Sequence, residues 1–356
     1  MARLIRSFCV WYLYVPHMAF LRLIGPRAAI VLARFFAFVQ WLAMLAGGDR
    51  RTRAAFRRAQ PTFTCRESLA GILLNYVIQK HQRFVEWYLY PTPAGRAYVK
   101  SSYRLEGKEH LDAALAEGKG VVVLMFHYGM GKMVFAALQE LGYRNHHHVF
   151  RGMTYAKHTT GYVARKALET FVASEKASGL SIVYHRPFFA FTSMARLLRK
   201  NEIVGMNGDG MMGTEFVEVP FLNGTMPFPT GPARMAAQTG APIVSIYALP
   251  NGWFSHRLIA HPAIRCAKDT PELVEQCVRE YTGLLDEYTR RYPWAWWTWR
   301  RLEVSPGADG RPRYVAHALA QEEGSYHTAE GQAAGGANGR AGGGTTERRV
   351  KETADV

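Results

Sequence analysis

Short apolar runs alternate with amphipathic stretches from residue 64 to about residue 303. The run VVVLMF at 121–126 contains no polar residue, which is typical of a buried parallel strand. Further strands are predicted at 147–150, 180–184, 202–207 and 242–249. Helices are predicted at 66–88, 132–141, 158–176, 190–199, 231–239 and 270–290, with a short helix inside 103–120. Strands that alternate with helices predict an α/β fold with a mostly parallel sheet covered by helices.

The beginning of the chain has a different pattern. Two apolar stretches, 8–24 and 28–47, are long enough to cross a bilayer, but polar residues interrupt both, Arg34 and Gln40 in the second. An arginine in the middle of a spanning helix costs about 3 kcal/mol. A tilted span, helices lying in the membrane interface and buried helices of a soluble core are all open alternatives. Of these, the first two fit the mixture of arginine and aromatic residues better.

The end of the chain loses apolar periodicity after residue 304. Seven of the fourteen residues at 331–344 are glycine, and a disordered tail is predicted over 304–356. The expected organisation is therefore membrane-associating helices over 1–63, an α/β domain over 64–303 and this tail.

The charge of the chain points to an anionic partner. The net charge is +16, and residues 1–60 hold ten arginines, no lysine and the single acid Asp49. Arginine mixed with aromatic and aliphatic residues fits an anionic membrane surface. No recognised nucleic-acid-binding motif accompanies the charge, so no nucleic-acid partner is predicted.

Cysteine and histidine patterns give no indication of a metal site. The four cysteines are scattered without CxxC spacing, which suggests neither zinc binding nor a disulfide framework. His146, His147 and His148 are consecutive, so they cannot all face one ion from a strand. No metal and no cofactor are expected.

The segment VVVLMFHYGMGK at 121–132 is the clearest candidate for chemistry. His127 directly follows a predicted buried strand and precedes Gly129 and Gly131. The carboxyl edge of an open α/β sheet is where such folds collect their ligands. A single histidine is more often structural than catalytic, and the neighbouring glycines, which permit close backbone approach, favour a site only modestly.

Four blocks of sequence, in order, resemble the bacterial lipid A lauroyl/myristoyl acyltransferase family of the lysophospholipid acyltransferase superfamily. They are RAAFRRAQP (53–61), RLEGKEHLDAALAEGKGVVVLMFHYGMG (104–131), NGDGMMGTEFVEVPFLNGTMPFPTGPARMAAQTGAPIV (207–244) and YPWAWWTWRRLE (292–303). The resemblance thus spans about 50–303.

The resemblance implies a His-x4-Asp/Glu pair, with His127 as the general base and a carboxylate that orients it. This chain has Lys132 at the acidic position, and a lysine cannot accept the imidazole N–H. Asp209 is the preferred replacement because it follows the predicted strand 202–207 and would emerge at the same sheet edge. Glu215 and Glu218 are weaker alternatives, and an ordinary loop role for Asp209 is about as plausible.

Further residues are candidates for substrate binding. Arg151, which corresponds to a strand-end arginine of the family, is expected to bind acceptor phosphate or the oxyanion, with Arg165 as a second choice. Lys132 is a third basic candidate. The segment 224–233 is predicted to be a loop lining a cleft, and the helix that begins near Gly231 offers backbone N–H groups to an anion. Solvated arginines in ordinary loops would give the same pattern.

The resemblance implies transfer of a fatty acyl group from acyl carrier protein, or from acyl-CoA, to a lipid or glycolipid acceptor. The basic chain suits an acidic carrier protein. No covalent acyl-enzyme is expected, because the chain has neither a GxSxG elbow nor a cysteine beside a histidine. The expected location is the cytoplasmic face of the bacterial inner membrane.

Two alternative functions remain open from the sequence. One is a non-catalytic relative that binds lipid or a partner, which Lys132 favours. The other is an acyltransferase with a different acceptor, such as an aminolipid or a secondary metabolite.

Overall fold

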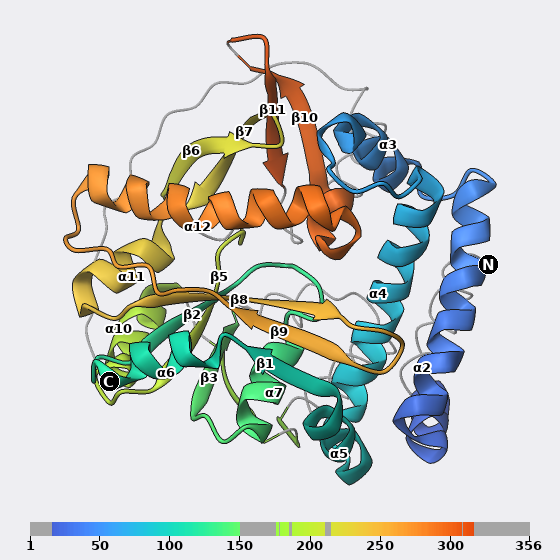
Figure 1. Cartoon of the computed structure of the whole chain (residues 1–356), viewed down its shortest axis with the longest axis horizontal. Helices are drawn as coiled ribbons and strands as arrows, with labels where there is room; N and C mark the ends of the chain where they lie inside the picture. The colour runs from blue at the N-terminus through green and yellow to red at the C-terminus, as the bar shows by residue number, and fades with distance from the viewer. Residues whose placement is uncertain are drawn as a thin grey trace, which may run out of the picture. The chain divides into compact units, whose positions relative to one another are not determined.

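The chain is described by a computed structural model over residues 16–149, 176–177, 179–184, 187–210, 215–307 and 309–316. All of these residues belong to one compact unit. A seven-stranded sheet and a four-stranded sheet lie on opposite sides of the long helix α12 (Pro271–Arg291) in Figure 1.

The bounds of the elements are as follows. The main sheet contains β1 (Tyr103–Glu106), β2 (Val121–Met125), β3 (Asn145–Val149), β4 (Ser181–Tyr184), β5 (Ile203–Asn207), β8 (Ile243–Pro250) and β9 (His256–Ala260). The second sheet contains β6 (Phe216–Phe221), β7 (Gly224–Pro229), β10 (Leu302–Pro306) and β11 (Pro312–Ala316). The other helices of the described chain are α2 (Pro16–Leu45), α3 (Arg50–Ala59), α4 (Leu69–Leu89), α5 (Pro93–Ser102), α6 (Lys108–Ala116), α7 (Met133–Glu140), α10 (Pro187–Leu198) and α11 (Gly231–Thr239), with 3-10 turns η1 (Gln60–Thr62), η2 (Pro293–Ala295) and η3 (Trp297–Arg301).

The main sheet has the strand order β1-β9-β8-β2-β5-β3-β4. Every neighbouring pair except β8–β9 is parallel, which confirms the predicted mostly parallel sheet. Strand β2 is central and wholly buried. Its side chains alternate between two cores: Val122 and Leu124 pack with α11 and α12, whereas Val123 packs with α7. Burial on both faces explains its uninterrupted apolar sequence.

The five strands predicted from apolar runs are confirmed to within two residues as β2, β3, β4, β5 and β8. The predicted helices correspond to α4, α6, α7, α10, α11 and α12 with ends displaced by at most a few residues. The helix predicted at 158–176 lies almost entirely outside the described residues.

The segment 224–233 is not the loop that its composition predicts. Residues Gly224–Pro229 form β7, which pairs antiparallel with β6 from Phe216↔Pro229 to Phe221↔Gly224. On its other side β7 pairs with β11 only at Thr225, so its prolines lie outside that short ladder. Proline is tolerated where no ladder hydrogen bond is required, which is why the composition was misleading.

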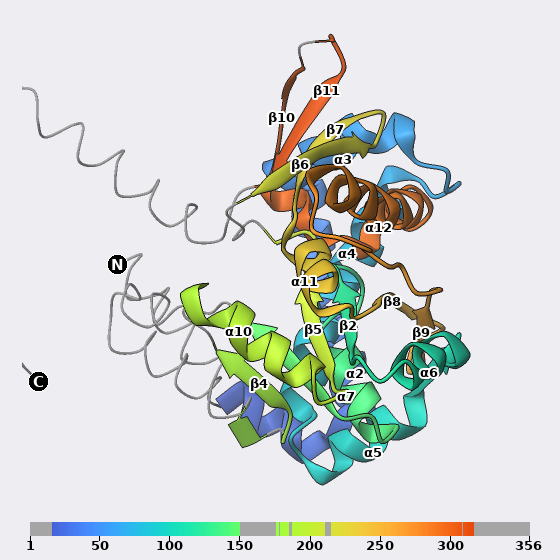
Figure 2. The ribbon, with the colours of Figure 1, turned by 90° about the vertical axis from the view of Figure 1, so that its left-hand side faces the viewer.

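The prediction of disorder from residue 304 onward is also wrong in its first part. Strands β10 and β11 form an antiparallel hairpin that extends as far as Ala316. The Tyr314 side chain is buried and its hydroxyl donates to the Leu222 carbonyl over 3.1 Å. The second sheet, which includes this hairpin, lies at the opposite end of the unit from α5 (Figure 1, Figure 2). Residues 317–356 lie outside the described chain.

Over the residues that are described, the predicted apolar stretches 8–24 and 28–47 lie on the two sides of a break in α2 at Gly25. Gly25 has φ 78° and precedes Pro26, and the helix kinks there. Helix α2 runs antiparallel along α4 (Figure 1, right). At one end the Arg22 guanidinium lies 4.7 Å from the centre of the Tyr88 ring. At the other end Trp41 Nε1 donates to the Ala70 carbonyl over 2.9 Å.

Candidate active site

Strands β2 and β5 bring the two main candidates together. Their parallel register pairs Met125 with Asn207, the last residue of each strand. His127 lies two residues after the end of β2, and Asp209 lies two residues after the end of β5, so both emerge at the same level of the same sheet edge. The catalytic roles of the two residues remain predictions, but their proximity is a property of the fold.

The imidazole and the carboxylate form a direct hydrogen-bonded pair. His127 Nδ1 lies 2.9 Å from Asp209 Oδ1, and the His127 backbone N–H donates to the same oxygen over 3.0 Å. The Asp209 side chain is fully buried, whereas the His127 side chain is 24% exposed. Since Nδ1 carries the proton that Asp209 accepts, the neutral ring presents unprotonated Nε2 as its acceptor.

The Asp209 carboxylate is ionised despite its burial. Burial raises the pKa of Asp209. The charge of His127 and the hydrogen bonds from His127 and Trp296 lower it by more than burial raises it, so the net pKa is below the ordinary value. An ionised carboxylate beside Nδ1 stabilises the imidazolium that forms when His127 accepts a proton.

The tryptophan-rich segment 294–299 encloses this pair. Trp296 Nε1 donates to Asp209 Oδ2 over 2.9 Å, and the Thr298 hydroxyl lies 3.5 Å from the same oxygen. The Trp297 backbone N–H donates to the His127 carbonyl over 2.8 Å. Sequence reasoning missed that one of these tryptophans binds the candidate carboxylate. A buried indole N–H requires an acceptor, which is the only sequence signal for this role.

In the loop after His127, Gly129 lies too close to the backbone of β8 to carry a side chain. Gly129 has φ 51°, and a Cβ atom there would lie 1.7 Å from the Ala248 carbonyl oxygen. The Gly129 carbonyl accepts from Trp297 Nε1 over 2.8 Å. Close backbone approach to β8 thus holds the loop that carries His127.

The residues considered as alternatives to Asp209 lie elsewhere. Lys132 lies at the start of α7, and its ammonium is 5.0 Å from the centre of the Trp87 ring of α4. Glu215 forms an ion pair with Arg234 at 2.6 Å, and Glu218 on β6 forms an ion pair with Arg313. Both glutamates thus bind arginines, whereas the Asp209 carboxylate is hydrogen-bonded to His127.

The candidate substrate-binding residues have different outcomes. Arg151 and Arg165 lie outside the described residues, so their roles stay predictions. Gly231 begins α11, and a Cβ atom there would lie 4.0 Å from the Met206 side chain, near the end of β5. Sequence reasoning missed Arg83, which donates from α4 to the Gly129 carbonyl over 3.3 Å.

Comparison with known proteins identifies the family of the chain. The model of the bacterial lipid A biosynthesis acyltransferase family matches residues 3–302. The chain belongs to this family. Family membership therefore covers the α/β domain, both site residues and the tryptophan-rich segment.

Curated relatives in this family are distant. Phosphatidylinositol mannoside acyltransferases from two strains of Mycobacterium tuberculosis are each 25% identical over 181 residues, which are 49% of this chain and 52% of the relative. The chain therefore spans about half the length of the curated relatives it matches.

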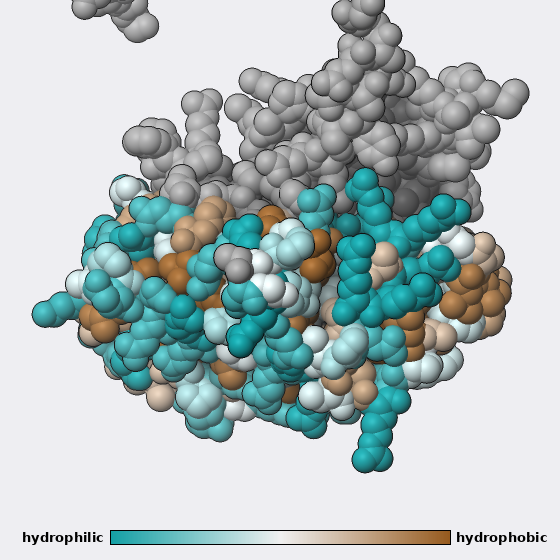
Figure 3. Space-filling model, turned by 90° about the horizontal axis from the view of Figure 1, so that it is seen from above, coloured by the Kyte–Doolittle hydropathy of each residue, from teal (hydrophilic) through white to brown (hydrophobic). Residues whose placement is uncertain are grey.

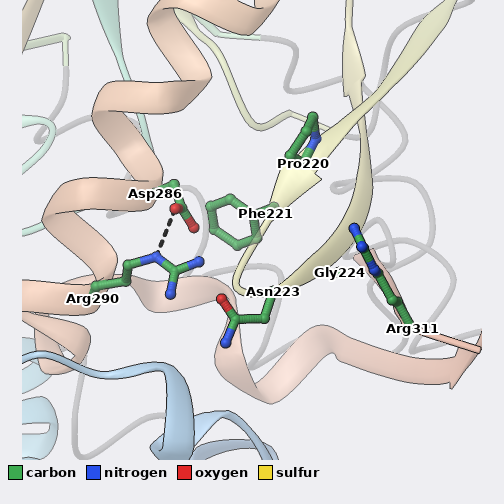
Figure 4. Close-up of a pocket in the computed structure, with 7 residues that line it drawn as sticks. All are labelled: Pro220, Phe221, Asn223, Gly224, Asp286, Arg290 and Arg311. Atoms are coloured by element: carbon green, nitrogen blue, oxygen red, sulfur yellow. Dashed lines mark hydrogen bonds and ion pairs between the residues drawn. The ribbon is translucent and has the colours of Figure 1, made fainter.

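A cavity of about 370 Å³ lies away from the His127–Asp209 pair, between α12 and the β6–β7 turn (Figure 4). Asp286 and Arg290 of its wall form an ion pair at 2.7 Å. Asp286 also accepts from the Leu222 backbone N–H over 2.7 Å. These charged groups already have partners, so the cavity does not present an unpaired charge from α12 to a ligand.

His146 also has partners within the fold. Its Nδ1 lies 2.6 Å from the Ser181 hydroxyl, and its Nε2 contacts the Glu202 carboxylate. Among the residues that the structure describes, no group of three or more histidine, cysteine or acidic side chains is placed to hold a metal ion.

Proposed function

We propose that the protein transfers a fatty acyl group from a carrier thioester to an acceptor hydroxyl or amine on a lipid, with His127 as the general base. The observation that carries this proposal is the His127–Asp209 pair, which leaves Nε2 available at a partly exposed position. Membership of an acyltransferase family supports the reaction class.

The proposed reaction is direct acyl transfer. His127 Nε2 accepts the proton of the acceptor hydroxyl as its oxygen attacks the thioester carbonyl. Asp209 holds the ring through Nδ1–H and stabilises the imidazolium. The tetrahedral intermediate then expels the thiolate, which takes the proton from Nε2, so the products are the acyl ester and the free thiol. His127 and Asp209 return to their starting states, and no redox cofactor is needed.

The acyl donor is proposed to be acyl carrier protein, with acyl-CoA as the alternative. The net charge of +16 supports docking of an acidic carrier. Arg151 remains the proposed partner of the oxyanion or of acceptor phosphate. The non-catalytic alternative loses its main support because Asp209 supplies the carboxylate that Lys132 cannot.

Helix α2 supports association with a membrane. Residues Ala19–Leu45 are long and apolar enough to cross a bilayer, by length and composition. Two polar side chains in its second half point inward, whereas Arg22 and Arg27 are exposed. Arg34 donates to Gln82 over 3.1 Å, and Gln40 bonds to His81 over 2.7 Å. Its exposed face carries the large apolar residues Phe20, Leu23, Val31, Phe35, Phe36, Phe38, Val39, Leu42 and Leu45. An exposed helix face with this many large apolar side chains matches lipid better than water.

The packing of α2 favours an interfacial position over a span. Its contacts with α4 extend from Arg22 to Trp41, and α4 is itself packed against the α/β domain. Crossing the bilayer would carry α4 into the hydrocarbon together with buried polar groups such as Glu86. We therefore propose that α2 lies in one leaflet with its outer face in lipid.

Helix α3 supports contact with anionic headgroups. It follows α2 directly, and its inner face packs through Phe56, whose ring centre lies 4.7 Å from that of Trp299. Its arginines are Arg50, Arg51, Arg53, Arg57 and Arg58. Seen from above, the molecule is mainly hydrophilic, with an apolar group at the edge where α2 lies (Figure 3). This arrangement supports the cytoplasmic face of the bacterial inner membrane as the location.

The test is product formation by the purified full-length protein. It is incubated in nanodiscs of bacterial lipid extract with acyl carrier protein thioester or acyl-CoA, and new acyl lipids are identified by mass spectrometry. We expect an acylated glycolipid or phospholipid with the wild type and none with His127→Ala. Absence of any thioester-dependent product from the wild type would overturn the proposal.

A further inference from the structure

Arg83 and His127 lie against the same indole. The Arg83 guanidinium carbon is 3.3 Å from the centre of the Trp297 ring, a stacked arrangement. The His127 ring centre is 5.7 Å from that of Trp297, in an edge-on arrangement. One aromatic side chain therefore separates a guanidinium from the proposed catalytic base.

Two more basic side chains accompany Arg83. Lys80 lies one helical turn earlier on α4, and Arg300 lies in η3, and both are exposed. Burial of part of the Lys80 side chain lowers its pKa, and the charges of Arg300 and Arg83 lower it further, while Asp49 opposes this. Lys80 therefore lies within range of the charges of both Arg83 and Arg300.

These cations lack ion-pair partners in the described part of the chain. No carboxylate there lies within 4.0 Å of Lys80, Arg83 or Arg300. Burial also lowers the pKa of Arg83. The indole face and the Gly129 carbonyl compensate only partly for the water that Arg83 loses. By contrast, Arg234 and Arg257 each bind a carboxylate.

We infer that Lys80, Arg83 and Arg300 form a binding site for a substrate phosphate group, one indole ring away from His127. Arginine and lysine side chains recognise phosphate by charge-assisted hydrogen bonds, and a bound phosphate would supply the anionic partner that these three side chains lack in the described part of the chain. The phosphate belongs either to the acyl donor or to the headgroup of the lipid acceptor. The inference rests on the proposed function only for the role of His127.

The test measures binding without turnover, in the full-length protein carrying His127→Ala. Isothermal titration in detergent micelles compares 4′-phosphopantetheine with pantetheine, and dihexanoyl phosphatidic acid with dihexanoylglycerol. Each pair differs in phosphate, and the two pairs distinguish the donor from the acceptor. The variants are Lys80→Met, Arg83→Met and Arg300→Met. Arg104→Met on β1 is the control, because Arg104 is also exposed and forms no ion pair with a described carboxylate.

We expect one phosphorylated probe to bind about tenfold more tightly than its unphosphorylated counterpart, as charge-assisted hydrogen bonds predict. Each cluster variant should remove most of that difference, and Arg104→Met should leave it unchanged. If Arg83→Met does not fold, Lys80→Met and Arg300→Met decide, because both side chains are exposed. Equal binding of both members of each pair, or full binding by these two variants, would overturn the inference. Phosphate-dependent binding without acyl transfer by the wild type would refute only the proposed function.

Discussion

The indole of Trp296 and the carboxylate of Asp209 are joined by a buried hydrogen bond of 2.9 Å. The bond connects two segments 87 residues apart in sequence. Trp296 binds Oδ2 of the carboxylate, whereas the His127 Nδ1 binds Oδ1, so each carboxylate oxygen has its own side-chain partner. The tryptophan-rich end of the domain is therefore part of the support of the candidate active site.

Removing the base should abolish most of the activity. We expect His127→Ala to lower the transfer rate at least about 100-fold, the usual contribution of a positioned base. Circular dichroism and thermal unfolding should be close to those of the wild type, because the side chain is partly exposed. Activity within a few-fold of the wild type would refute the catalytic assignment.

Asp209 and Lys132 should differ sharply in their effects. We expect Asp209→Asn to reduce the rate nearly as much as loss of the histidine, by about 100-fold, because the neutral amide neither orients the correct tautomer nor stabilises the imidazolium. Lys132→Ala should change the rate only a few-fold, since the Lys132 ammonium lies over Trp87. Steady-state kinetics of both variants checks this. A large loss at Lys132 with none at Asp209 would reverse the assignment.

Replacing the indole donor should test the support of the carboxylate. Trp296→Phe keeps most of the buried aromatic surface but removes the N–H that binds Asp209, which we expect to cost about 1–3 kcal/mol of stability. The rate should fall as well, with little change in KM. The matched control is Trp294→Phe, whose N–H bonds to Glu67 away from the site. Equal rate losses in the two variants would contradict a specific role for Trp296.

The lowered pKa of Asp209 predicts a particular dependence of stability on pH. A free aspartate has a pKa of about 3.9, so the ionised carboxylate contributes its full stabilisation above that value and loses it as the pH falls through the lower folded-state pKa. The difference in the free energy of unfolding between the wild type and Asp209→Asn should shrink as the pH falls below about 4, where the carboxylate becomes protonated. Urea unfolding at several pH values between about 5 and about 2 measures it, and a difference that does not shrink in this range would be inconsistent with an ionised Asp209.

Acidic substitutions on the outer face of α2 should weaken membrane binding without unfolding the domain. Phe35→Glu with Val39→Glu adds two charges at exposed positions, and we expect at least about a tenfold loss of liposome binding. The control Arg199→Glu changes an exposed charge at the end of α10. Liposome flotation in high salt gives the comparison. Unchanged flotation of the double variant would show that this face does not contact lipid.

Deletion of residues 1–60 would be a poor test of membrane anchoring. Phe56 is fully buried and contacts Trp299, and the inner face of α2 packs on α4. Removing residues 1–60 would expose both surfaces, so loss of solubility would report unfolding and not the loss of an anchor.

The sequence predicted the parts of the fold in which one signal dominates. The apolar run of β2 predicts a strand buried on both faces. In a parallel sheet, β2 and β5 end at the same carboxyl edge. His127 and Asp209 could be paired on that basis, because both follow strands of the same sheet. The roles of Trp296 and Arg83 could not be predicted, because they depend on long-range contacts between segments with ordinary helix or turn patterns. Strand β7 was missed because its prolines and glycine have the composition of a loop.

Helix α2 and helix α4 remain in contact from Arg22 to Trp41, and α4 also carries Arg83. If α2 lies in one leaflet of the bilayer, acceptor molecules reach the His127 imidazole by lateral diffusion within that leaflet. The rate would then follow the mole fraction of acceptor in the surface and not its bulk concentration. Adding inert lipid at a fixed amount of acceptor would slow the reaction, which is the behaviour known as surface dilution.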